Sequence, residues 1–250
     1  MSRQPVAVVT GAARGIGRAT ARALAARGFV VVLLDRDEEA ARAAAATIAT
    51  PTHVLGCDIA DVAASADVAA RIAHLAGPVD CLVNNAGIGA PLRGDVLDLA
   101  PENFDRVIAV NLRGTVFLTQ AIARRMLADA SDRLRSIITV TSVSAALASP
   151  ERLDYCISKA GLAVFTQGLA LRLAPHGIGV FDVRPGIIRT DMTEGVAARY
   201  DALIEGGLVP ARRWGEPEDV AAAIVGLATG PFYATGSVVA VDGGLGIPRF

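Results

Sequence analysis

Short and almost entirely apolar runs recur along the chain, and longer stretches with a helical period of apolar residues separate them. The apolar runs are rich in valine and isoleucine and have the length of strands. Strands without an apolar–polar alternation are typical of parallel sheets that are covered on both faces. The predicted strands are residues 6–10, 29–34, 53–58, 79–85, 136–142, 178–183 and 237–243.

The stretches between these runs are rich in alanine and predict amphipathic helices. Pro101 stands where the first turn of a helix accepts a proline, so a long helix is expected to begin there. The other predicted helices are residues 15–27, 38–49, 62–75, 153–174 and 218–228.

The alternation of strands and helices predicts an α/β protein with a doubly wound sheet of seven mainly parallel strands and helices on both faces. No linker, internal repeat or low-complexity tract divides residues 1–250, so we expect a single domain. Residues 186–217 lack a clear period. Loops of this length inside a compact domain are usually functional, and we expect this one to cover a substrate.

Composition excludes several classes of function. The chain is 52% hydrophobic and has a formal net charge of −1, which gives no support for a nucleic-acid partner or an anionic membrane surface. It has no apolar run long enough to span a membrane, and its first residues are not expected to be a signal peptide. The odd cysteine count and the three scattered histidines predict neither a disulfide framework nor a metal site, and together these features predict a cytoplasmic protein.

A glycine-rich turn directly follows the first predicted strand. Gly11, Gly15 and Gly17 allow a tight turn that a ligand can approach closely, and the helix that follows offers free N–H groups to a pyrophosphate. A glycine triplet also occurs in turns without a ligand. The position after the first strand favours dinucleotide binding.

The residues at the ends of the next two strands bear on the choice of cofactor. Asp35 is positioned to accept hydrogen bonds from an adenosine ribose and would repel a 2′-phosphate, which favours NAD. Arg14 and Arg36 are the opposing signal, because either arginine could pair with the phosphate of NADP. Asp58 is expected either to contact the adenine or to cap a loop.

Tyr155 and Lys159 lie four residues apart on a predicted helix and therefore share one face. Lys159 is the only lysine in the chain. An ammonium about 5 Å from a phenol, at an effective dielectric constant of about 20, would lower the phenol pKa by about two units. The pair therefore predicts a general acid/base, although the same spacing also occurs in ordinary exposed helices.

Two further polar residues are expected near this pair. Ser142 ends the fifth strand at the same sheet edge as Gly11 and Asn85, and Ser144 is a weaker candidate for the same role. Neither serine belongs to a G-x-S-x-G elbow, so a hydrolase triad is unsupported. Asn111 interrupts an apolar helical pattern and needs polar partners, which a structural bond to the backbone would also provide.

Taken together, these motifs identify the chain as similar to the short-chain dehydrogenases/reductases, whose fold is a single-domain Rossmann-type sheet. The resemblance covers essentially the whole chain. It implies that Tyr155 is the general acid/base, that Lys159 lowers its pKa and binds the nicotinamide ribose, that Ser142 orients the carbonyl, and that Asn111 holds a water. The matching motifs are Thr10-Gly11-x-x-x-Gly15-x-Gly17, Asn84-Asn85-Ala86-Gly87, Asn111, Ser142, Tyr155-x-x-x-Lys159 and Pro185-Gly186.

The resemblance also implies a set of cofactor-binding residues and no metal. Ile188 and Thr190, after the sixth strand, would contact the nicotinamide carboxamide. The implied cofactor is NAD, with NADP possible. The complete set is Gly11, Arg14, Gly15, Ile16, Gly17, Asp35, Arg36, Asp58, Ile59, Asn85, Ala86, Gly87, Tyr155, Lys159, Pro185, Gly186, Ile188 and Thr190.

The subgroup that the chain resembles is the 3-oxoacyl-[acyl-carrier-protein] reductases, through "RWGEPEDVA" and "YATGSVVAVDGG". The expected activity is interconversion of a secondary alcohol and a ketone by hydride transfer. The alternatives are an NAD-dependent dehydrogenase of a sugar, polyol or cyclic alcohol, and a catalytically silent dinucleotide-binding module.

The resemblance further implies a homotetramer with residues 238–250 at an interface, although a packed terminal strand would explain their apolar character as well. The expected partner is a small-molecule alcohol or ketone, in a pocket lined by residues 88–95, 144–154 and 186–210. Side chains singled out there are Arg93, Asp95, Arg152, Met192, Tyr200 and Leu203. Arg152 and Arg189 could serve an anionic substrate, although exposed arginines are more often solvated.

Overall fold

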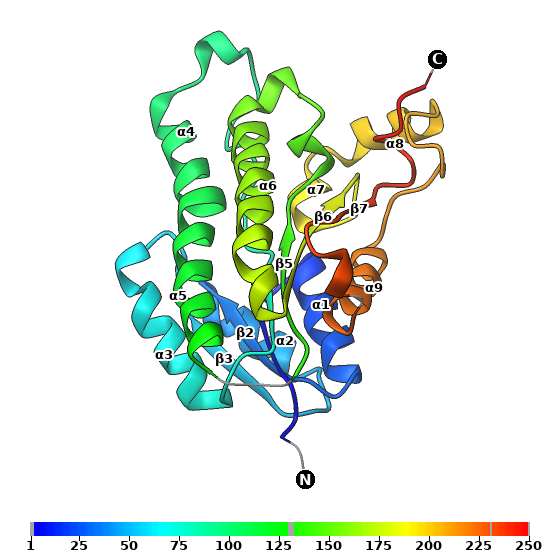
Figure 1. Cartoon of the computed structure of the whole chain (residues 1–250). Coiled ribbons are helices and arrows are strands. Elements are labelled where there is room, and N and C mark those ends of the chain that lie inside the picture. The colour runs from blue at the N-terminus through cyan, green and yellow to red at the C-terminus, as the bar shows by residue number, and fades with distance from the viewer. Residues whose placement is uncertain (1–2, 130–132, 231, 250) are drawn as a thin grey trace.

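The computed structural model describes residues 3–129, 133–230 and 232–249. In these ranges, seven strands form one sheet in the order β3-β2-β1-β4-β5-β6-β7, and every neighbouring pair is parallel (Figure 1). The predicted doubly wound fold is confirmed. The strands are β1 (Val6–Thr10), β2 (Val30–Asp35), β3 (Thr52–Gly56), β4 (Cys81–Asn84), β5 (Arg135–Val140), β6 (Ile178–Pro185) and β7 (Val238–Val241).

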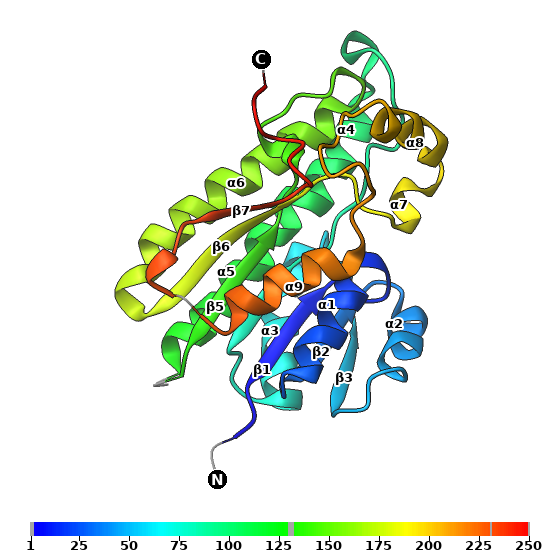
Figure 2. The same cartoon turned by 90° about the vertical axis from the view of Figure 1, so that its right-hand side faces the viewer.

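Helices cover both faces of the sheet. Figures 1 and 2 show α1, α2 and α9 on one face and α3, α5 and α6 on the other. The α-helices are α1 (Gly15–Ala26), α2 (Glu38–Ala45), α3 (Ser65–Ala76), α4 (Pro101–Val107), α5 (Thr115–Ala128), α6 (Leu153–Leu173), α7 (Asp191–Glu194), α8 (Ala197–Glu205) and α9 (Pro217–Ala228). Short 3₁₀ turns span Val62–Ala64, Val96–Asp98, Val143–Ala145, Pro150–Arg152, Ala174–His176 and Phe232–Ala234.

The apolar character of the strands produces a core on each side of the sheet. In β1, Ala7 and Val9 pack with α1 and α9, whereas Val6 and Val8 pack with α3 and α5. Successive side chains of a strand point to opposite faces, so a strand between two helical layers must be apolar throughout. This burial fixes the register that brings the carboxyl ends of the strands to one edge.

The helix predicted from Pro101 is not a uniform α-helix. It consists of α4, a π-helical segment at Ile108–Gly114 and α5. A π-helical turn accommodates extra residues in an otherwise continuous helix, and such turns are frequent at functional sites. The turn contains Asn111, which is completely buried.

Two other predictions differ from the structure. The second helix was expected to reach residue 49 but ends at Ala45, and Thr47 donates a hydrogen bond to the carbonyl of Ala44 instead of continuing the helix. The stretch 186–217 was expected to be a loop but contains α7 and α8. A capping box of Thr190 and Thr193 starts α7, which is too short to show a hydrophobic period.

No helix in the described part of the chain has the length and apolarity needed to cross a membrane. Within the same residues, no cluster of three histidine, cysteine or acidic side chains is arranged to hold a metal ion.

Candidate active site

A cavity of about 610 Å³ opens at the carboxyl ends of the strands, where open α/β sheets bind their ligands. Eighteen of the predicted site residues line it. Gly17 and Asn111 do not, and both act through their neighbours as described below. The lining residues from the predicted set are Gly11, Arg14, Gly15, Ile16, Asp35, Arg36, Asp58, Ile59, Asn85, Ala86, Gly87, Ser142, Tyr155, Lys159, Pro185, Gly186, Ile188 and Thr190.

The glycine turn forms one end of the cavity. Gly11 and Gly15 have φ values of +64° and +49°, which disfavour other residues. A Cβ atom on Gly17 would lie 2.0 Å from the carbonyl oxygen of Gly11, so this glycine allows the turn to close on α1. The Asn85 amide holds the turn in place by donating to the carbonyls of Thr10 (2.9 Å) and Gly11 (3.1 Å).

This end of the cavity fits a dinucleotide. Arg14 is the N-cap residue of α1, but its side chain accepts no hydrogen bond from the helix. The first N–H groups of the helix therefore remain available for a pyrophosphate. The glycine turn leaves room beside them, and Asp35 lies at the end of β2 where a ribose is bound in such folds. The residues present therefore match the group that the sequence implies.

The carboxylate of Asp35 is fixed by the backbone. Its two oxygens accept hydrogen bonds from the N–H groups of Ala13 and Asp37, each at 3.0 Å. Arg14, one of the two arginines that favour NADP, forms an ion pair with Asp37 at 2.9 Å. Arg36 lines the cavity as predicted. The cavity therefore presents the fixed carboxylate of Asp35, while the neighbouring Arg14 is paired with Asp37.

Asp58 and Ile59 lie beyond β3 and line the cavity. Asp58 also accepts a hydrogen bond from the N–H of Ala60 at 2.9 Å, which is the loop-capping role anticipated for it. Both expected roles are thus compatible with its position.

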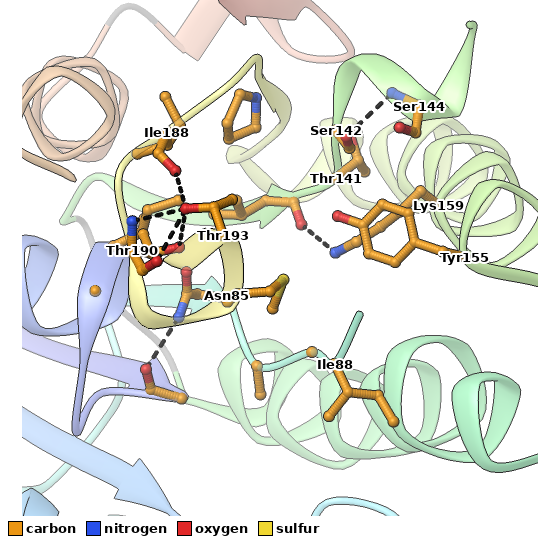
Figure 3. Close-up of a pocket in the computed structure, with 18 of the residues that line it drawn as sticks. Asn85, Ile88, Thr141, Ser142, Ser144, Tyr155, Lys159, Ile188, Thr190 and Thr193 are labelled. Carbon is orange, nitrogen blue, oxygen red and sulfur yellow. Dashed lines mark hydrogen bonds between the residues drawn. The ribbon is translucent and has the colours of Figure 1, made fainter. Parts of the chain in front are cut away.

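Tyr155 and Lys159 lie side by side on α6 and face the cavity (Figure 3). The ammonium nitrogen of Lys159 is 5.7 Å from the centre of the phenol ring and donates a 3.0 Å hydrogen bond to the carbonyl of Val140 at the end of β5. Burial lowers the pKa of Lys159 to about 8, although the carboxylate of Asp182 opposes this shift. The predicted juxtaposition on one helix face is present.

The predicted direction of the Tyr155 pKa is wrong in this structure. Burial raises the pKa of the phenol, while a hydrogen bond with Ser142 and the charge of Arg152 lower it. The prediction considered only the charge of Lys159 and omitted desolvation, which disfavours the phenolate. The cation that counteracts burial here is Arg152, whose guanidinium carbon is 5.2 Å from the ring centre.

Ser142 connects the tyrosine to the end of β5. Besides its interaction with Tyr155, its hydroxyl oxygen accepts a 3.0 Å hydrogen bond from the N–H of Ser144. The Ser144 hydroxyl in turn accepts a 3.1 Å hydrogen bond from Arg152. Ser142 is therefore the serine next to the tyrosine, and Ser144 supports Arg152.

Asn111 acts from behind the cavity wall. Its amide oxygen accepts from the N–H of Ile88 at 2.7 Å, and its amide nitrogen donates to the Ile88 carbonyl and to Ser158. These bonds satisfy the buried side chain that the sequence identified. They also fix the segment after β4, so that Gly87 and Ile88 line the cavity.

The substrate end of the cavity matches the prediction only in part. Arg152, Met192 and Tyr200 line it as expected, whereas Arg93, Asp95 and Leu203 do not. Residues 91–98 are exposed, which places Arg93 and Asp95 outside the site. Around the whole cavity, the lining residues that the sequence did not predict include Ala13, Asp37, Cys57, Val110, Val140, Thr141 and Leu245.

Comparisons with known proteins agree with this geometry. Residues 11–246 match a family model described as enoyl-(acyl carrier protein) reductase. A crystal structure of 3-oxoacyl-[acyl-carrier protein] reductase from Brucella melitensis in complex with NAD is 55% identical and superposes with a TM-score of 0.94, with both chains fully covered.

Two curated relatives have different activities. The 3-oxoacyl-[acyl-carrier-protein] reductase of Synechocystis is 40% identical over 96% of both chains. The L-rhamnose 1-dehydrogenase (NAD(P)(+)) of Azotobacter vinelandii is 38% identical over 95% of both chains. The chain belongs to the short-chain dehydrogenase/reductase family and is an NAD(P)-dependent oxidoreductase that acts on alcohol and keto groups.

Proposed function

We propose that the protein interconverts 3-oxoacyl and 3-hydroxyacyl compounds, as thioesters or as the corresponding acids, with NAD(H). The observation that carries the proposal is the apolar lining of the substrate end, to which Val143, Leu147, Met192, Leu208 and Leu245 contribute. An acyl chain fits such a surface, whereas a sugar or polyol needs several polar partners. The 3-oxoacyl reductases among the relatives support the same substrate class.

The preference for NAD over NADP rests on Asp35. Its carboxylate is held in position by two backbone N–H groups and would repel a 2′-phosphate. The ion pair between Arg14 and Asp37 reduces the positive charge available to such a phosphate. The similar Brucella protein was crystallised with NAD, which supports this preference.

In the proposed mechanism, each side chain has one task. When bound, the dinucleotide supplies the hydride to the carbonyl carbon. Tyr155 gives its phenolic proton to the carbonyl oxygen, and Ser142 orients that oxygen. Lys159 holds a positive charge beside the phenol, and Asn111 fixes the wall segment at Ile88. Met192 and Tyr200, from residues 186–217, line the space for the substrate.

The proposal is tested by assaying the purified protein in both directions, with one panel of substrates for reduction and one for oxidation. The reductive panel contains an S-acetoacetyl thioester of N-acetylcysteamine and acetoacetate, each with NADH and with NADPH. The oxidative panel contains L-rhamnose and sorbitol with NAD⁺. We expect turnover of the 3-oxoacyl compounds with NADH, and turnover confined to the sugar or polyol would contradict the proposal.

We further propose that the protein is a homotetramer in a reducing compartment such as the cytoplasm. Exposed apolar side chains on α5 and α6 support the assembly, with Val164 69% and Leu171 81% exposed. The edge strand β7 also exposes Val238. Cys57, Cys81 and Cys156 are free thiols, as a reducing compartment would maintain them. Light scattering of the wild type and of Val164→Lys tests the assembly, which we expect the charge to weaken.

A further inference from the structure

Arg152 is a cation in the wall of the cavity with no carboxylate at ion-pair distance among the described residues. Its guanidinium lines the cavity beside Tyr155. The charge of the neighbouring Glu151 interacts with Arg152 only weakly, because its carboxylate pairs with Arg199 at 2.7 Å. A partly desolvated charge without a counter-ion is costly, so an anionic ligand at this position would be stabilised.

The hydrogen bonds of Arg152 indicate which ligand would complete the site. One terminal nitrogen donates to the hydroxyl of Ser144 at 3.1 Å, which fixes the guanidinium plane. The Nε–H group is buried without a hydrogen-bond partner, so it is closed to the cavity, and a ligand there would meet the terminal nitrogens. A guanidinium offers pairs of parallel N–H donors, and a carboxylate is the group that matches them.

The position of Arg152 relates this ligand group to the reaction. Its guanidinium carbon lies 5.2 Å from the centre of the Tyr155 ring, on the same side of the cavity as Ser142 and Ser144. A carboxylate bound to Arg152 therefore lies only a few bonds from a carbonyl oxygen held by Tyr155. The other two arginines named in the cavity, Arg14 and Arg36, line the end formed by the glycine turn and β2. Lys159 lies near the same phenol but donates to the carbonyl of Val140.

We propose that Arg152 is a specificity-determining residue that binds the carboxylate of a short 3-oxo or 3-hydroxy acid. This inference rests on the proposed function and narrows it from 3-oxoacyl compounds in general to the free acid. A thioester carbonyl would accept one hydrogen bond from Arg152 but would leave its charge without a counter-ion. The apolar residues Leu147 and Met192 would contact the remainder of the substrate.

The test compares three matched substrates with NADH: acetoacetate, methyl acetoacetate and the N-acetylcysteamine thioester. We expect the wild type to prefer the acid. In Arg152→Ala, kcat should fall to the same extent for acid and ester, because the charge beside Tyr155 is lost in both cases. KM for the acid alone should rise about 10- to 100-fold, as expected for a lost charge-assisted pair. Arg152→Lys should recover part of the preference for the acid. Arg22→Ala removes an exposed arginine of α1 and serves as the control.

A second measurement does not depend on turnover. Calorimetry should detect binding of butanoate, but not of butanamide, to the wild-type protein loaded with NADH, and Arg152→Ala should abolish it. Absence of butanoate binding by the wild type would overturn the inference. An equal rise of KM for acid and ester in Arg152→Ala, together with a lower melting temperature, would assign Arg152 a structural role instead.

The two proposals fail in different ways. Turnover of the ester and thioester in preference to the acid would retain the proposed function and reject the role of Arg152. Turnover of none of the three substrates, combined with butanoate binding that requires Arg152, would reject the 3-oxoacyl function and retain the carboxylate site.

Discussion

The two ends of the cavity are built in different ways. At the end near β1 and β2, the backbone forms the surface: the glycine turn, the N-terminus of α1 and the Asp35 carboxylate that backbone N–H groups hold. At the other end, side chains form the surface, and they come from the segments after β5 and β6 and from Leu245. A backbone surface tolerates little change, whereas a side-chain surface can be altered residue by residue.

Replacing Tyr155 at the junction of the two ends should have the largest effect. In Tyr155→Phe the phenolic proton is absent, and we expect kcat to fall about 1,000-fold, within the range for general acid catalysis. Fluorescence titration should give an unchanged Kd for NADH, because the glycine turn is untouched. A variant that keeps most of its turnover would show that another group moves the proton.

A single added methyl group at the glycine turn should lower both the stability of the protein and its affinity for NADH. In Gly17→Ala the new Cβ would lie 2.0 Å from the Gly11 carbonyl oxygen, and we expect a loss of about 2–3 kcal/mol in unfolding free energy, with weaker NADH binding. Gly226→Ala is the matched control, because its Cβ on α9 meets no atom within 4 Å. If Gly17→Ala kept the melting temperature and the NADH affinity of the wild type, the close backbone contact at the glycine turn would not be needed for cofactor binding.

The acidic group at this end should determine cofactor preference. Asp35→Ala removes the carboxylate that opposes a 2′-phosphate, and we expect the ratio of kcat/KM for NADH to that for NADPH to fall about 10-fold or more. Steady-state kinetics with both cofactors measures the change. An unaltered ratio would mean that Asp35 only orders the turn through Ala13 and Asp37.

A pH profile should distinguish Lys159 from Tyr155. The pKa of Lys159 is lowered to about 8, so its ammonium is present below that pH and is lost above it, whereas burial raises the pKa of Tyr155. We expect kcat/KM for ketone reduction to fall about tenfold per pH unit above 8. In Lys159→Arg the charge persists, so this decline should disappear even though the overall rate is lower. A wild-type profile that stays flat to pH 10 would contradict the assignment.

The side-chain end should respond least to a single change. Met192 lines the cavity but remains 53% exposed, so Met192→Ala should raise the KM of an acyl substrate only about threefold and leave the Kd of NADH unchanged. Steady-state kinetics across acyl chain lengths measures this effect. A large loss of NADH affinity would show that the two ends are coupled.

The same contrast explains how far the sequence could predict the molecule. The seven strands followed from apolar runs, and the glycine turn followed from its place after β1, because backbone geometry depends on local sequence. The order of the strands in the sheet came from the structure. Gly17 and Asp35 were identifiable for this reason. The π-helical turn at Asn111 was not, because it depends on hydrogen bonds to Ile88, a residue distant in sequence.

The substrate end was predicted less well because loops determine it. Arg93 and Asp95 were expected in the pocket, but their segment is exposed and they do not line it. Leu245 was missed because it reaches the cavity from the C-terminal segment through tertiary packing. Arg152 was expected in the pocket, either serving an anionic substrate or solvated, and its hydrogen bond to Ser144 and its place beside Tyr155 became visible once the side chains were placed.

The C-terminal segment has a practical consequence for anyone who purifies this protein. Leu245 forms part of the cavity wall, and Arg249 donates hydrogen bonds to the carbonyls of Gly207 and Leu208, the second of which also lines the cavity. The N-terminal segment lies at the opposite end of the molecule, where Arg3 pairs with Asp80 (Figure 1). An affinity tag on the C-terminal side of Arg249 should therefore disturb the cavity wall more, and change the measured KM more, than a tag on the N-terminal side of Arg3.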